Sequence, residues 1–183
     1  MIVAEEKRKN NISEYILYMW QIEDAIRALD VNMEKITDVL INNYKVSDEK
    51  REQISTWFSN LTLMMTKEQK TQTGHLQFLE NLVNDLNRFH LALLNEQADM
   101  EYTRIYNEIK PDLELVRSKS GQNHHDIEVA LNTLYILLML KIKNQAIEED
   151  TQKAVWKFGN FMGYFSKLYK AFEQGNLTLE SYS

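Results

Sequence analysis

Apolar residues recur along most of this chain at intervals of three and four, the spacing of a helix buried on one face. The pattern predicts about seven helices, at residues 4–29, 31–44, 48–69, 76–94, 99–121, 126–143 and 150–174. Two interruptions are expected: a break near Asn10 and Asn11, and an end or kink at Pro111, whose ring lacks an N–H and clashes with the preceding turn. No segment alternates apolar and polar residues as a half-buried strand does. The sequence therefore predicts an all-α fold.

Turn-forming residues are scarce, with five glycines and one proline among 183 residues. Short connections between helices follow from this scarcity, and the length fits one domain. We expect residues 1–175 to form a single-domain helical bundle and residues 176–183 to be a flexible C-terminal tail. The predicted helix at 126–143 is apolar on two nearly opposite arcs. It is therefore expected either at the centre of the bundle or at a contact between subunits.

The charge of the chain weighs against nucleic acid as a partner. Its formal net charge is −6, and its 21 lysines and arginines are scattered instead of forming a basic face. The chain has no cysteine, which excludes disulfides and thiolate chemistry and fits a reducing compartment. Its start lacks the apolar region of a secretory signal, and its longest apolar run, residues 134–140, is too short to span a membrane. We expect a soluble, cytoplasmic protein without membrane contact.

Glu23 and Arg27 stand out because they fall inside the apolar arc of the first long helix. They are four residues apart with the acid first, which is the favourable orientation for an ion pair within a helix. Each buried charge needs a partner, because removing a charge from water costs several kcal/mol. The favoured interpretation is an ion pair that ties this helix to a neighbour. The alternatives are a polar pocket, with Arg27 holding an anion that Glu23 orients, or exposure of both side chains.

The segment RSKSGQNHH, residues 117–125, carries the most mixed chemistry, with Arg117, Lys119 and His124 around a glycine. The separation of Arg117 from His124 resembles the R-x(4–6)-H motif of HEPN ribonucleases, which are also helical bundles. The favoured interpretation is a basic helix C-terminus followed by a polar loop. Zinc normally takes three or four protein ligands, and the chain contains neither H-E-x-x-H nor E-x-x-H. No metal and no cofactor are expected.

Trp156, Gly159 and Gly163 share one flank of the last predicted helix, away from its main apolar arc. A G-x-x-x-G spacing in an amphipathic helix indicates close approach of a neighbouring helix. An exposed tryptophan beside such a flank is typical of a protein contact. This flank is therefore a candidate interface, with packing inside the chain as the alternative.

The opening segment EKRKNNISEYILYMWQIEDAIRA resembles the start of an uncharacterised family of helical proteins from Bacteroides-type bacteria. Later segments are similar to that family as well: GHLQ at 74–77, RSKSG at 117–121, LYILLMLKIKNQAI at 134–147 and DTQKAV at 150–155. The resemblance covers nearly the whole chain. It implies a short, single-domain bacterial protein of the cytoplasm, from a family with no assigned activity, cofactor or catalytic residue.

These observations favour a non-catalytic helical protein that acts through protein–protein contact or self-association, as a homodimer or with another protein. The first alternative is a small-molecule-binding protein or enzyme whose polar pocket includes Glu23 and Arg27. The second is a HEPN-like ribonuclease that uses Arg117 and His124.

Overall fold

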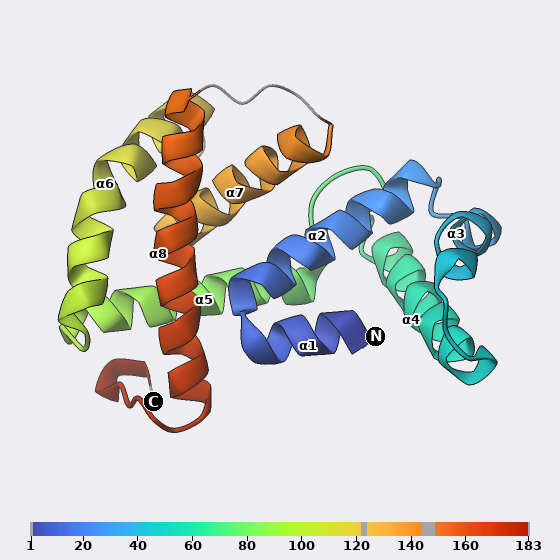
Figure 1. Ribbon diagram of the computed structural model, residues 1–183, viewed down its shortest axis with the longest axis horizontal. Coiled ribbons are helices and arrows are strands. Elements are labelled where there is room, and N and C mark those ends of the chain that lie inside the picture. The colour runs from blue at the N-terminus through green and yellow to red at the C-terminus, as the bar shows by residue number, and fades with distance from the viewer. Residues whose placement is uncertain (1, 122–123, 144–148, 183) are drawn as a thin grey trace.

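The computed structural model describes residues 2–121, 124–143 and 149–182 (Figure 1). These residues form helices and no strand, which confirms the all-α prediction. The α-helices among them are α1 (Ile2–Asn10), α2 (Ile12–Ala28), α3 (Met33–Val39), α4 (Asp48–Lys67), α5 (Gln77–Asn95), α6 (Met100–Ser120), α7 (Asp126–Ile142) and α8 (Glu149–Glu173). Two short 3-10 helices are η1 (Ile41–Asn43) and η2 (Glu180–Tyr182).

The first predicted helix is divided at Asn11, so eight α-helices replace the seven expected. Asn11 has extended backbone angles, and its side-chain oxygen accepts a hydrogen bond of 3.1 Å from the backbone N–H of Glu14. This is an N-cap, which satisfies an N–H that the first turn of a helix leaves unpaired. Asn32 and Asp99 cap α3 and α6 in the same way.

Pro111 lies inside α6, so of the two expectations for this position, an end or a kink, the end is wrong. A proline removes one backbone N–H and leaves the carbonyl one turn earlier, that of Asn107, without its helical partner. Both Pro111 and Asn107 are exposed, and water can bind the carbonyl at low cost. The helix ends instead at Gly121, whose positive φ of 65° suits a residue without a side chain.

α8 organises the larger part of the fold. It packs against α2, α6 and α7, and Figure 1 shows it running between α6 and α7. Its buried phenylalanines meet aromatic side chains of α5 and α6 in the core: Phe158, Phe161 and Phe165 of α8, Phe89 of α5 and Tyr102 of α6. The hydroxyls of Ser13 in α2 and Ser166 in α8 are buried and 2.6 Å apart, so these two helices approach closely.

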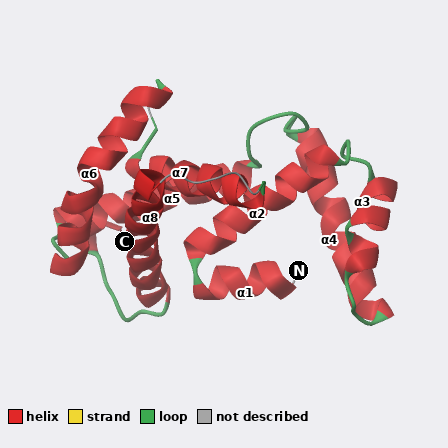
Figure 2. Cartoon of the chain, turned by 45° about the horizontal axis from the view of Figure 1, so that its top comes forward, coloured by secondary structure: helices red, strands yellow, loops and turns green. Residues whose placement is uncertain are grey.

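The segment from α3 to α4 lies at the opposite end of α2 from α6 and α8 (Figures 1 and 2). α4 packs mainly against α3 and η1. Ile36, Ile41, Phe58 and Met65 are fully or almost fully buried there and belong to the same hydrophobic core as the rest of the chain. The loop from α4 to α5 then returns the chain to α2.

Residues 176–182, for which the sequence suggested a flexible tail, fold back onto α5. Leu179 is buried, and the ring of Tyr182 lies 5.7 Å from that of Phe89 and 5.2 Å from that of Phe172. The carboxylate of Glu96 accepts hydrogen bonds from the backbone N–H groups that open η2. Aromatic packing and backbone hydrogen bonds together fix this end of the chain.

α7 is buried on two sides only over its first half. Val129 and Ile136 share one of the two apolar arcs, but Val129 is 3% exposed and Ile136 is 60% exposed. Ile142, at the end of the helix, is 59% exposed. The C-terminal half of α7 therefore carries apolar side chains on the surface. Among the described residues, no helix combines the length and the apolar character needed to cross a membrane.

Candidate functional site

A cavity of about 480 Å³ lies between α2, the loop before α5, α5 itself and the start of α7. We call it the His75 cavity. Its wall is lined by Trp20, Gly74, His75, Leu79, Glu80, Val83, Asn84, His124, Glu128 and Asn132. The wall combines apolar and polar groups, with two histidines and two glutamates among them. Such a mixture is typical of a site that orients a small molecule.

Glu23 does not line the cavity but binds His75, which does. Its side chain is fully buried, and each carboxylate oxygen has a partner: Nδ1 of His75 at 2.6 Å and the backbone N–H of Leu76 at 2.8 Å. An ionised carboxylate only accepts hydrogen bonds, so Nδ1 of His75 carries the proton. The other ring nitrogen, Nε2, is then a hydrogen-bond acceptor. Within the described part of the chain no protein group is bonded to it.

Trp20 fixes the plane of the His75 ring. The two rings are stacked with centroids 4.3 Å apart and an angle of 16° between their planes. Tyr135 packs edge-on against Trp20, with ring centroids 5.5 Å apart, and its hydroxyl donates to Asp24. The indole N–H of Trp20 is buried and has no hydrogen-bond partner among the described residues. A ring held by a carboxylate and an aromatic plane keeps one orientation, which is what a binding residue requires.

Arg27 binds a different set of groups from Glu23. Its guanidinium pairs with Asp24 at 2.7 Å and donates to the backbone carbonyls of Lys70, at 3.1 Å, and Gly74. Among the described residues, Glu23 and Arg27 do not form the predicted ion pair with each other. Glu23 binds His75 and Leu76 instead, and Arg27 binds Asp24 and two loop carbonyls. Both side chains fasten the loop of residues 70–76 to α2, and Arg27 does not line the His75 cavity.

The opposite wall repeats the pairing of a histidine with a glutamate. Nδ1 of His124 lies 2.8 Å from Oε1 of Glu128, one helical turn further along. Glu80, from α5, is paired with Lys70 at 2.7 Å. Of these wall residues the sequence singled out only His124. His75 follows a loop and shares no periodic pattern with Glu23, so nothing in the local sequence joins the two.

Arg117 belongs to a neighbouring polar cluster and not to the cavity. Its Nε donates to the backbone carbonyl of His124 at 3.0 Å, and its guanidinium pairs with Asp126. Tyr106 donates to the same carboxylate at 2.7 Å, and Nε2 of the buried His90 lies 3.6 Å from it. The pKa of Asp126 is well below its ordinary value, first because of His90 and then because of Tyr106 and Arg117, while partial burial opposes the shift.

The remaining residues of the 117–125 segment form no site with Arg117. Lys119 is exposed, and residues 122 and 123 lie outside the described residues. The side chains of Arg117 and His124 have different acidic partners, Asp126 and Glu128. Nor do three or more His, Cys, Asp or Glu side chains gather, among the described residues, into a group that could hold a metal ion.

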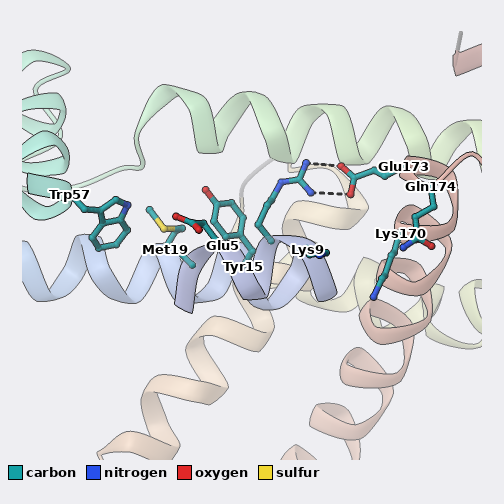
Figure 3. Close-up of a pocket in the computed structure, with 10 residues that line it drawn as sticks. Glu5, Lys9, Tyr15, Met19, Trp57, Lys170, Glu173 and Gln174 are labelled. Carbon is teal, nitrogen blue, oxygen red and sulfur yellow. Dashed lines mark hydrogen bonds and ion pairs between the residues drawn. The ribbon is translucent and has the colours of Figure 1, made fainter. Parts of the chain in front are cut away.

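A second cavity, of about 590 Å³, lies between α1, α2, α4 and the end of α8 (Figure 3). Its floor includes Tyr15, Met19 and Trp57. The guanidinium of Arg8 and the carboxylate of Glu173 form two parallel hydrogen bonds of 2.7 and 3.0 Å, drawn as dashed lines in Figure 3. This ion pair joins α1 to the end of α8. Because the acid and the base satisfy each other, they offer little to a ligand.

The flank with Trp156, Gly159 and Gly163 faces outward. Trp156 is 71% exposed, both glycines are exposed, and a Cβ added to either glycine would meet nothing within 4 Å. No helix of the described chain therefore packs on this flank. We call the outward side of α8 from residue 152 to residue 170 the α8 face.

Comparison with known proteins places the chain in a family without assigning an activity. No curated protein matches it, and no solved structure matches it. A family model described as Domain of unknown function (DUF4924) matches residues 1–176. That range contains the whole α8 face and the whole His75 cavity. Since it takes in nearly all of the 183 residues, the chain belongs to the DUF4924 family.

Proposed function

We propose that this protein acts by contact with another protein chain, without catalysis, and that the contact surface is the α8 face. The observation that carries the proposal is the exposure of Trp156 beside two glycines that no other helix of the described residues covers. Tryptophan is enriched among the residues that contribute most to binding at protein interfaces. Glycines beside it let a partner approach the backbone closely.

The charge of α8 indicates what the partner presents. Residues 151–172 contain four lysines and no acidic residue, whereas the whole chain has a net charge of −6, so the other residues together carry −10. Lys153, Lys157 and Lys167 are exposed around Trp156 and the glycines. A basic face with an aromatic centre is complementary to an acidic protein surface.

A second copy of this chain can supply that acidic surface. We propose a homodimer in which the α8 face of each copy rests on an acidic part of the other. A symmetric contact of α8 with α8 is disfavoured, because it would bring lysines against lysines. A reducing bacterial cytoplasm, where a chain without cysteine is ordinary, is part of the same proposal.

Native mass spectrometry and light scattering over a range of protein concentration test this proposal. A dimer is expected, and Trp156→Ala should weaken it by about 2 kcal/mol, or roughly thirtyfold in Kd. Lys167→Glu should weaken it too, and added salt should have the same effect. Met100→Ala is the control, because Met100 is 86% exposed but lies on α6.

Three results would contradict the proposal. The chain could stay monomeric at every concentration, which would exclude self-association. A dimer unaffected by both Trp156→Ala and Lys167→Glu would show that another surface is used. A dimer strengthened by salt would exclude the contact between opposite charges.

A further inference from the structure

The His75 cavity has a chemistry that the α8 face does not use. We propose that it binds a small molecule carrying an ammonium group. His75 would contact this ligand directly, and Glu23 would act as a positioning residue that sets the tautomer of His75.

The first step of the argument is the direction of the hydrogen bonds. Nδ1 of His75 donates its hydrogen bond to the carboxylate of Glu23, so the lone pair of Nε2 is left for a ligand. The side chain of His75 is 30% exposed, which makes it reachable from the cavity. Glu80 and Glu128 also line the wall, and their carboxylates add acceptors, whereas the amides of Asn84 and Asn132 can both donate and accept.

The second step is the sign of the charge. Two glutamates line the cavity, and no lysine or arginine is among the described residues of its wall. Lys70 pairs with Glu80 but is not part of the wall, and Arg27 is held by the loop carbonyls. Lys70 offsets the charge of Glu80, so the wall charge that an anion would meet is the carboxylate of Glu128, whose partner is the imidazole of His124. A cationic donor is therefore the ligand that fits.

The third step is the apolar part of the wall. Trp20, Leu79 and Val83 line the cavity between the polar groups and are at most 5% exposed. Apolar surface of this kind favours short methylene chains, and an ammonium group has three N–H donors for the surrounding acceptors. Together these features point to a small alkyl amine.

Putrescine is the probe, with butane-1,4-diol as an uncharged analogue of equal length and succinate as an anionic one. We would follow the imidazole NMR signals of the intact protein at a pH of about 8, where ordinary imidazoles are neutral and alkyl amines are charged. Putrescine should shift the signals of His75 and His124 and leave those of His90 unchanged, because His90 is buried in another cluster.

Glu128→Gln is the variant, because it removes a charge from the wall without touching the buried Glu23. It should weaken putrescine binding by about tenfold, the loss expected for one charge-assisted hydrogen bond. Glu108→Gln is the matched control: it makes the same substitution at a side chain that is 61% exposed on α6. Its affinity for putrescine should equal that of the parent chain.

Several outcomes would overturn the inference. The first is that neither histidine responds to putrescine up to about 10 mM, well above a millimolar Kd. Binding of the diol or of succinate as tightly as the amine would exclude an ammonium ligand. Equal losses in Glu128→Gln and Glu108→Gln would attribute binding to the net charge of the chain instead of the cavity.

Discussion

At the scale of single residues, Asp126 joins three helices. It is the first residue of α7, and it accepts a hydrogen bond from Tyr106 and forms an ion pair with Arg117, both of which lie in α6. It also lies beside His90 of α5. Donors and a neighbouring imidazole favour the ionised carboxylate, which is why the pKa of Asp126 is depressed. Stability at this point of the fold is therefore linked to pH.

The linkage has a definite sign. A carboxyl whose pKa is lower in the folded than in the unfolded chain contributes stability above the unfolded value, about 4, and that stability is lost as pH falls through the folded value. Asp126→Asn should lower the free energy of unfolding by about 1–3 kcal/mol at pH near 7 and flatten its decline below about pH 4. Urea unfolding at a series of pH values measures both effects.

Asp85→Asn is the control for this experiment, because the side chain of Asp85 is 44% exposed and pairs with an exposed arginine. It should leave the unfolding free energy nearly unchanged. A variant at position 126 that unfolds with the same dependence on pH as the parent chain would contradict the role given to Asp126.

Glu23 and Arg27 show how far sequence reasoning reaches at this scale. Their places on the apolar arc of a predicted helix signalled two charges that need partners. The partners themselves, His75 and the carbonyls of the 70–76 loop, are about fifty residues away along the chain. Helical periodicity describes only neighbours one or two turns apart, so it cannot identify partners that tertiary folding brings in.

At the scale of elements, periodic patterns located most helices, and local capping decided where they end. Asn11 divides the first helix because its side chain caps α2, which was readable from the sequence as a break near this position. Pro111 was expected to end or kink α6, but its exposed position lets the helix continue. The packing of residues 176–182 could not be predicted, because a segment of seven residues is too short to show a period.

The C-terminal segment yields a prediction at the same scale. Leu179 is 3% exposed, so Leu179→Ala should lower the free energy of unfolding by about 2 kcal/mol or more by leaving a cavity against the core. Thr178 is exposed and next to it, and Thr178→Ala should change stability by less than about 0.5 kcal/mol. Chemical denaturation compares the two variants, and equal stabilities would mean that the segment is loose in solution.

At the scale of the whole molecule, α2 connects two regions that differ in how they are held. α5, α6 and α8 share an aromatic core against which α7 packs, whereas α4 packs mainly against α3 and η1. The loop after α4 is fastened to α2 by Glu23 and Arg27. Regions with fewer shared contacts open at lower free energy than the global unfolding transition. The α3–α4 region is therefore expected to open first. The contacts between α2 and the loop after α4 should oppose this opening.

Hydrogen exchange detected by mass spectrometry tests that expectation. In the parent chain, amides of α4 should exchange faster than those of α5 and α8. Arg27→Met removes the donors to the carbonyls of Lys70 and Gly74, and should cost about 1–2 kcal/mol locally, or roughly 5- to 30-fold faster exchange of residues 48–76. Arg88→Met, at a side chain 71% exposed on α5, should leave exchange unchanged. Faster exchange over the entire chain in Arg27→Met would show instead that α4 unfolds only together with the α5–α8 core.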